Sequence, residues 1–246
     1  MQTVAIESLD NEGRGIARVD GKVIFIEGAL PGEQVEYTSL RRKPSYEVAE
    51  VSRIVRASSQ RVTPECPHFG TCGGCSLQHL NTSAQTAVKQ RVLEDALWHL
   101  SRLKPEQIFP AIAGNSWGYR LRARFSARHV ANKGGTLVGF REKHSSYVAV
   151  MDSCAVLPPP VSALIPQLKT LINGLSQPER VPQVEVAVGG SRTVLLLRHL
   201  VALTSDDLDR LRAFADEHSI IWYLQSGGPD TVTLFHPADA GLLSYT

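Results

Sequence analysis

Four cysteines constrain this chain more than any other feature of its sequence. Cys66, Cys72 and Cys75 lie at C-x5-C-x2-C spacing, Cys154 follows much later, and the 246 residues contain no other cysteine. Two thiolates separated by two residues can bind one metal centre, and the Gly73-Gly74 pair between them allows a tight turn. The spacing therefore indicates a metal site completed by Cys154.

The cysteines alone leave several alternatives open. Disulfides belong mainly to secreted proteins, and the N-terminal residues lack the basic and apolar regions of a signal peptide. A structural zinc site usually has two Cys-x-x-Cys knuckles, whereas this chain has one. Three close cysteines and one remote cysteine are typical of an iron–sulfur site. We favour a cluster, with zinc and then free thiols as alternatives.

The composition is that of a soluble globular protein, with 43% hydrophobic and 20% charged residues. No stretch is long enough to cross a bilayer, so no membrane partner is expected. The net charge of +2 is unevenly distributed, because residues 89–143 carry eleven basic and four acidic side chains. This asymmetry predicts a basic face that binds a polyanion.

Residues 1–56 have the pattern of about five short strands separated by glycine turns. Asp20-Gly21 between two β-rich runs predicts a hairpin, and the strand number predicts a small barrel of a kind that often binds nucleic acid. A basic loop, Arg41-Arg42-Lys43, follows the fourth predicted strand. Taken alone, the basic residues of this loop are explained by a solvent-exposed surface loop.

Three segments carry a resemblance to a known family. Asn11–Arg18 and Leu30–Glu33 resemble a TRAM domain, an OB-like RNA-binding module. Together with the segment Cys66–Leu80, they make the chain similar to the bacterial 23S rRNA (uracil-5-)-methyltransferases that carry an iron–sulfur cluster, and most similar to their 1939-type branch. The resemblance implies that the four cysteines bind a 4Fe-4S cluster. It also implies 23S rRNA as the partner.

A second basic stretch, Tyr119–Arg128, alternates with a period of two. Its apolar residues fall on one face of a predicted strand and its arginines on the other. A solvated edge strand is the alternative, but an arginine row without an acid favours contact with RNA phosphates and bases. The resemblance extends this RNA surface to Arg141. The predicted RNA-binding residues are Arg14, Arg18, Arg41, Arg42, Lys43, Arg120, Arg122, Arg124, Arg128 and Arg141.

The remaining elements are predicted from periodicity. Helices are expected at 81–103, at 162–173 and, capped by Ser205, at 205–218. The 81–103 helix has an apolar stripe that, by resemblance, packs on a methyltransferase domain. Further strands are expected at 137–141, 147–151, 183–188, 193–197, 220–224 and 231–235, with a turn at Gly189-Gly190-Ser191.

The predicted fold class is α+β. An N-terminal OB-like barrel (TRAM) at 1–62 precedes a mixed α+β iron–sulfur domain at 63–80 and 116–246, and a helical segment occupies 81–115. No strand, glycine-rich loop and helix follow one another as in an adenosyl-cofactor site. A catalytic Rossmann-like domain is therefore predicted to be absent.

By resemblance, the family transfers a methyl group from S-adenosylmethionine to carbon 5 of a uracil, using a cysteine nucleophile. With all four cysteines assigned to the cluster, no thiol remains for that role. The chain is therefore predicted to be the N-terminal, RNA-recognising portion of such an enzyme, inactive alone, with S-adenosylmethionine binding only in the full-length member. The alternative is a stand-alone RNA-binding iron–sulfur or zinc protein. A cytoplasmic monomer is expected.

Overall fold

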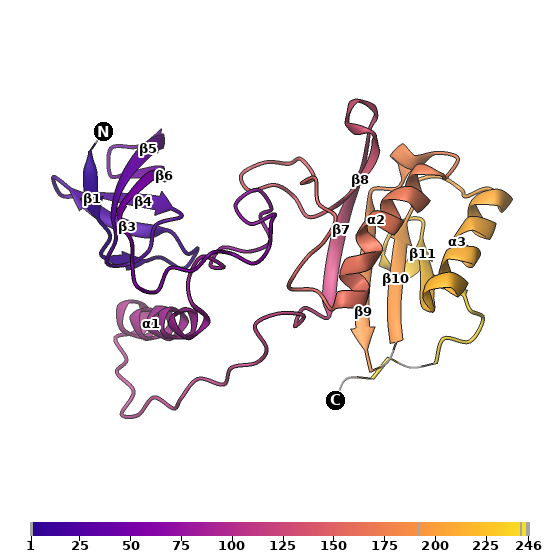
Figure 1. Cartoon of the computed structure of the whole chain (residues 1–246). Helices are drawn as coiled ribbons and strands as arrows, with labels where there is room; N and C mark the ends of the chain where they lie inside the picture. The colour runs from indigo at the N-terminus through magenta and orange to yellow at the C-terminus, as the bar shows by residue number, and fades with distance from the viewer. Residues whose placement is uncertain (1, 191, 242, 245–246) are drawn as a thin grey trace. The chain divides into compact units, whose positions relative to one another are not determined.

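A computed structural model describes residues 2–190, 192–241 and 243–244 (Figure 1). The chain divides into two compact units. The first comprises residues 1–70 and 75–114, and the second comprises residues 71–74 and 115–246. Ser191 of the predicted turn, and Leu242, Tyr245 and Thr246 at the end of the chain, lie outside the described residues.

The first unit contains a six-stranded mixed sheet in the order β1-β5-β6-β4-β3-β2. Every neighbouring pair is antiparallel except β4 and β6. Small and branched apolar residues fill its core, among them Ile24, Ile26 and Val35. The strands are β1 (Thr3–Ala5), β2 (Ser8–Leu9), β3 (Gly15–Val19), β4 (Lys22–Glu27), β5 (Gln34–Arg42) and β6 (Tyr46–Arg56).

The hairpin predicted at Asp20-Gly21 is confirmed. Val19 of β3 pairs with Lys22 of β4, so only Asp20 and Gly21 form the turn. Both residues have positive φ, at 50° and 79°, as a type I′ turn requires. The turn fixes the register of β3 against β4 and therefore which of their residues enter the core.

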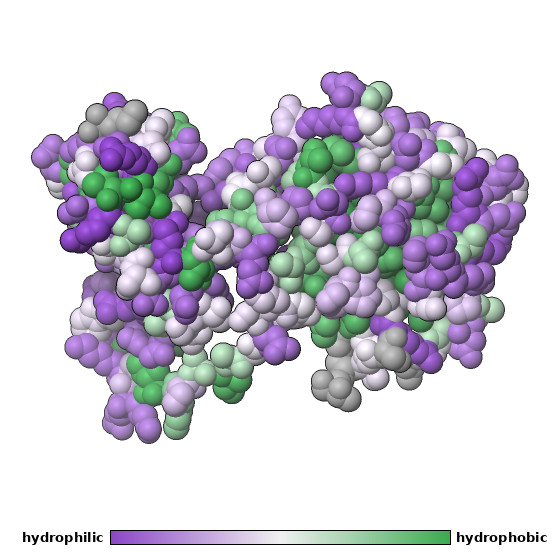
Figure 2. Space-filling model, in the orientation of Figure 1, coloured by the Kyte–Doolittle hydropathy of each residue, from purple (hydrophilic) through white to green (hydrophobic). Residues whose placement is uncertain are grey.

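Helix α1 (Thr82–Ser101) follows the sheet of the first unit. The Asn81 side chain accepts a hydrogen bond from the amide of Ser83, and Arg102 ends the helix in the left-handed conformation. No residue of α1 is buried, and Leu93 and Leu100 are exposed. Hydrophobic residues are visible at the surface over α1 and the segment after it (Figure 2). Within the described residues, no helix is long and apolar enough to cross a membrane.

The second unit contains a six-stranded mixed sheet in the order β12-β11-β10-β9-β7-β8. Only β10 and β11 are parallel. The strands are β7 (Arg122–Val130), β8 (Gly135–Gly139), β9 (Gln183–Gly189), β10 (Arg192–Arg198), β11 (Ile220–Gln225) and β12 (Val232–His236). Short 3-10 turns lie at Ala131–Lys133, Pro178–Arg180 and Pro229–Thr231.

Helices α2 (Pro159–Asn173) and α3 (Ser205–His218) pack on the same face of this sheet (Figure 1). Phe214 of α3 contacts Trp222 of β11, and α2 buries Leu164 and Leu168. The α3 cap is Thr204, one residue before the predicted Ser205, and it forms a capping box with Asp207.

Two details of the predicted elements are wrong. The helix predicted at 162–173 begins earlier, because α2 starts at Pro159, and Pro166 therefore lies in its interior. The strand predicted at 147–151 does not form. Val148 makes only an isolated bridge to Arg141, and the Ala149 amide donates to the carbonyl of Phe140. The apolar run there belongs to a partly buried loop, in which Val148 and Ala149 are buried and Tyr147 and Val150 are exposed.

The predicted fold class also needs correction. The described residues form two mixed sheets with α1, α2 and α3, and no metal site found among them defines the second unit as an iron–sulfur domain. Sequence periodicity identified most strands but not their pairing. The β10-α3-β11 segment forms a parallel strand–helix–strand unit with no glycine in its strand-to-helix connection, which the search for a glycine-rich loop could not detect.

Candidate functional site

The middle of the cysteine segment belongs to the second unit and lies along residues 140–143. Cys72 forms an antiparallel bridge with Glu142. The Gly73 amide donates to the carbonyl of Arg141 at 2.9 Å, and the Lys143 amide donates to the carbonyl of Thr71 at 2.8 Å. The backbone of Arg141 therefore helps to fix the cysteine segment, while its side chain is exposed.

The two glycines matter because they are small, since neither has a positive φ. A Cβ on Gly73 would lie 3.3 Å from the Arg141 carbonyl oxygen, and a Cβ on Gly74 would lie 3.4 Å from the Cys72 Sγ. The Gly74 amide itself donates to Cys72 Sγ at 3.4 Å. A backbone donor directed at a thiolate stabilises its charge, as around metal-bound sulfur.

The other cysteines are held by local hydrogen bonds. In the first unit, the Cys66 amide donates to Gln78 Oε1 at 3.3 Å. In the second unit, Cys154 is buried, and its amide donates to the Ser162 hydroxyl at 2.8 Å. None of the four cysteines, all of which are described, forms a disulfide.

The described residues contain no group of three or more His, Cys, Asp or Glu side chains arranged to hold a metal ion. Cys66 and Cys75 belong to the first unit, and Cys72 and Cys154 belong to the second. The four-cysteine cluster therefore stays a prediction.

The arginine stretch forms the strand β7 from Arg122 onward, with the alternation that its sequence predicts. Arg122, Arg124 and Arg128 are exposed, whereas Phe125 and Ala127 are buried. The pattern does not extend to residues 119–121, which precede the strand. Tyr119 and Leu121, expected on the apolar face, are 53% and 40% exposed.

Two contacts of the arginines were not predicted. Arg124 lies opposite Glu185 of β9, and its Nε donates to Glu185 Oε1 at 3.0 Å. Arg120 leaves the arginine row and stacks over Phe140, with its guanidinium carbon 5.8 Å from the ring centre. The sequence of one strand cannot show an acid on its partner, so the row is less uniformly basic than expected.

In the first unit, several predicted RNA-binding side chains are held by neighbouring acids. Arg14 forms ion pairs with Asp10 at 2.7 Å and Glu12 at 3.2 Å and stacks over Phe25. Arg18 pairs with Glu7, and Arg42 pairs with Glu47 at 3.4 Å. Arg41 and Lys43, at the tip of the β5–β6 hairpin, are exposed. The hairpin tip is therefore the part of this unit most available to a ligand.

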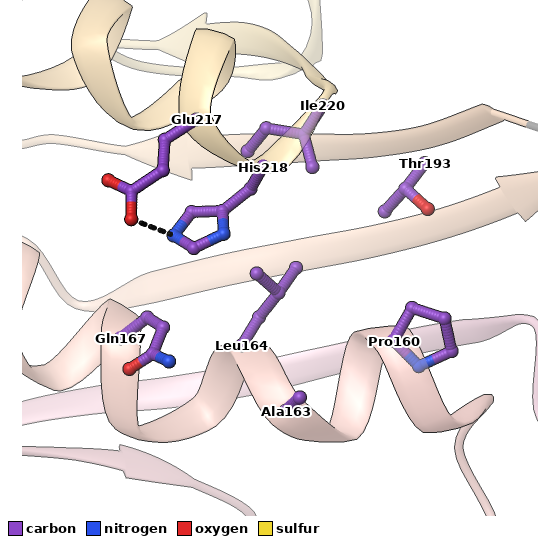
Figure 3. Close-up of a pocket in the computed structure, with 8 residues that line it drawn as sticks. All are labelled: Pro160, Ala163, Leu164, Gln167, Thr193, Glu217, His218 and Ile220. Carbon is purple, nitrogen blue, oxygen red and sulfur yellow. Dashed lines mark ion pairs between the residues drawn. The ribbon is translucent and has the colours of Figure 1, made fainter.

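A pocket of about 300 Å³ opens on the helix-covered face of the second sheet (Figure 3). Its polar side chains come from α2, β10 and the end of α3, where His218 Nε2 lies 4.0 Å from Glu217 Oε1. None of the predicted site residues lines it. The lining residues are Pro160, Ala163, Leu164, Gln167, Thr193, Glu217, His218 and Ile220.

The relatives found by comparison with known proteins share one name. The family model "TRAM domain" matches residues 1–36, which confirms the predicted module over that range. The chain is 56% identical over 246 residues to a 23S rRNA (uracil(1939)-C(5))-methyltransferase RlmD of Aromatoleum aromaticum, covering 100% of this chain and 57% of that protein. It is 58% identical over 241 residues to the protein of the same name from Bordetella parapertussis, covering 98% and 52%. The chain thus spans slightly more than half the length of these relatives.

A solved structure shares the fold. The crystal structure of Pyrococcus abyssi tRNA (uracil-54, C5)-methyltransferase in complex with S-adenosyl-L-homocysteine superposes with a TM-score of 0.65. The match has 18% sequence identity and covers 99% of this chain and 54% of that one. At this identity the likeness concerns the fold alone.

These comparisons correct the prediction of an inactive N-terminal portion whose fold lacks a catalytic part. The similarity to methyltransferases extends over 98–100% of this chain in sequence and over 99% in structure. The prediction depended on assigning every cysteine to a cluster, which is not shown, and on the absence of a glycine-rich loop. A fixed loop pattern is a weak criterion, because binding depends on the site's geometry rather than on one motif.

Proposed function

We propose that the protein is an S-adenosylmethionine-dependent methyltransferase that modifies carbon 5 of a uracil in 23S rRNA. The observation that carries this proposal is the identity of 56% to 58%, over nearly the whole chain, with proteins named for that reaction. The shared fold with a uracil C5-methyltransferase that was crystallised with S-adenosyl-L-homocysteine supports it. Of the uracils in 23S rRNA, the names of the relatives favour position 1939.

RNA recognition in this proposal uses the exposed basic side chains of both units. In the second unit these are Arg122, Arg124 and Arg128 on β7, together with Arg141 beside the cysteine segment. In the first unit they are Arg41 and Lys43 at the hairpin tip. Exposed guanidinium groups on a strand can follow a phosphate backbone, and the TRAM match is consistent with an RNA ligand.

We also propose that Cys66, Cys72, Cys75 and Cys154 bind a 4Fe-4S cluster. The donor set fits, because it consists of thiols only and Cys72 Sγ already accepts a backbone N–H bond from Gly74. Bound iron and sulfide would cross-link separate parts of the chain. The protein's own contribution is to supply the thiolates and to orient the amide donor.

The proposed reaction is tested by deleting the gene that encodes this chain and mapping methylated uridines in rRNA by mass spectrometry. We expect one 5-methyluridine to disappear from 23S rRNA and to return when the intact gene is restored. Unchanged 23S rRNA, or loss of 5-methyluridine from tRNA instead, would contradict the proposal.

A cytoplasmic location follows from this proposal, since bacterial ribosomes are assembled there. The monomeric state and the domain boundaries at residues 62, 80 and 115 also stay predictions. Analytical ultracentrifugation of the purified chain tests the first of these, and limited proteolysis tests the second.

A further inference from the structure

The second sheet has one face that its helices leave open. Alternate residues of each strand point to this face, and the strand registers place them in rows across the sheet. Helices α2 and α3 pack on the opposite face, against residues such as Trp222. Ala240 contacts one end of the open face, where the Arg192 side chain donates a hydrogen bond to the Ala240 carbonyl.

Two adjacent rows form what we term the open-face patch. The first row crosses five strands and consists of Arg124, Glu185, Leu196, Tyr223 and Leu234. The second row consists of Ser126, Gln183, Arg198, Gln225 and Val232. Leu234 and Val232 are each 37% exposed, and Tyr223 and Leu196 are partly exposed. A ligand on this surface would meet apolar and aromatic groups at its centre.

The charges around the patch are predominantly positive. Arg122 and Arg128 lie on the same face of β7 as Arg124, and Arg198 lies in the second row. Within the described residues, Arg128 and Arg198 form no ion pair, and Arg198 Nε has no hydrogen-bond partner. Glu185 is the one acid in the two rows, and it already accepts hydrogen bonds from Arg124 Nε and from the side-chain Nε2 of Gln183.

We propose that the open-face patch binds single-stranded RNA, an inference that rests on the proposed RNA-modifying function. A base stacks on Tyr223 and the apolar side chains beside it, while phosphates contact Arg122, Arg128 and Arg198. Aromatic residues on an exposed sheet are a common platform for unpaired bases, whose faces are hidden in a duplex. The excess of arginine over acid on this face favours a polyanion such as RNA over a protein partner, because Glu185 is the one acid among the two rows.

The test compares RNA binding by the whole chain and by two Tyr223 variants. Tyr223→Leu retains apolar volume but removes the flat ring, and Tyr223→Phe retains the ring. Fluorescence anisotropy is measured with a single RNA strand of about ten nucleotides and with the same strand in a duplex. We expect tighter binding of the single strand, about tenfold weaker binding by Tyr223→Leu, and near-normal binding by Tyr223→Phe. Tyr147→Leu, at a tyrosine that is 68% exposed and outside the sheet, is the matched control.

A second measurement uses only the wild-type chain, so its result does not depend on whether a variant folds. The wild-type chain is photo-crosslinked to thiouridine-substituted RNA. We expect cross-links in the peptides of β11 and β12. Strong RNA binding by the wild type with no effect of a folded Tyr223→Leu variant would show that RNA does not stack on this face, and it would overturn this inference alone. An equal loss in Tyr147→Leu would overturn it as well. No RNA binding by the wild type would instead reject the RNA recognition on which the inference rests.

Discussion

Glu33 is a fully buried carboxylate at the centre of a hydrogen-bond network in the first unit. Arg61 binds both of its oxygens, at 2.6 and 2.8 Å, and the amides of Leu30 and Ser58 donate to it. Burial raises the pKa of Glu33, but the hydrogen bonds from Arg61 and the amides outweigh burial and lower the pKa below its usual value. The ion pair therefore connects the β4–β5 loop to residues that follow β6.

Replacing Glu33 tests the strength of this network. We expect Glu33→Gln to lower the free energy of unfolding by about 3 kcal/mol at neutral pH, because Arg61 loses its charged partner. Since the pKa is lower in the folded state, this stabilisation is present above about pH 4.3 and is lost as the pH falls through the folded-state pKa. Urea unfolding of the wild type and of Glu33→Gln, measured at neutral and at acidic pH, should therefore show a smaller difference in unfolding free energy at acidic pH.

Glu36→Gln is the control for Glu33→Gln, because Glu36 forms only a 3.5 Å contact with the exposed Arg53. It should change stability by less than about 1 kcal/mol. An equal effect of the two substitutions at neutral pH would show that the buried network contributes no special stability.

Gly139 allows close packing at the edge strand β8 of the second unit. A Cβ there would lie 2.6 Å from both Cγ and Sδ of the buried Met151. We expect Gly139→Ala to destabilise the unit by about 2 kcal/mol, since the side chain of Met151 must move to make room for the added methyl group. Gly228→Ala, where nothing lies within 4 Å and φ is −70°, should be nearly neutral. Equal thermal denaturation midpoints for the two variants would contradict this account.

At the scale of the element, β7 shows how a strand presents charge. Its period of two places Arg122, Arg124 and Arg128 on one side, and its register against β9 determines that Arg124 faces Glu185. Arg124 is therefore partly neutralised in the free protein. Arg128 pairs with no acid in the described structure and should contribute more to the attraction of RNA.

Salt dependence measures this contribution. We expect the double variant Arg122→Ala/Arg128→Ala to weaken RNA binding and to reduce the slope of log K against log salt by about 1 to 2, since fewer counterions are released. Arg212→Ala on α3, whose side chain pairs with Asp209 on the helix-covered side, is the control and should leave the slope unchanged. An unaltered slope in the double variant would exclude β7 as a phosphate-binding strand.

At the scale of the whole molecule, the cysteines provide the clearest test. We expect protein purified without oxygen to be brown, with iron and sulfide in roughly equal amounts. Cys72→Ser and Cys154→Ser should lose this absorbance. Circular dichroism should show that these variants lose structure, and the second unit should lose more of it than the first. Ser153→Ala, adjacent to Cys154, should retain the colour. A colourless protein with one zinc would contradict the cluster proposal, and an unchanged fold without iron would contradict the expected loss of structure.

The sequence alone predicted many local features. Glycine turns and a period of two located most strands, and the structure confirms the Asp20-Gly21 hairpin and the alternation within β7. These features depend on neighbouring residues, so periodicity and turn chemistry are sufficient to detect them. The same reasoning was wrong at 147–151, where an apolar run marks a half-buried loop rather than a strand.

Outside the hairpins predicted from turn residues, only the tertiary structure decided which strands are neighbours. Glu185 opposite Arg124, the Tyr223 row and the parallel β10–β11 pair all join residues that are distant in the chain. The absence of a loop motif was consequently a poor guide to the fold, and the structural comparison corrected it. Periodicity fixes the face on which a side chain lies, but pairing between strands fixes which side chain lies beside it, and binding surfaces depend on the second.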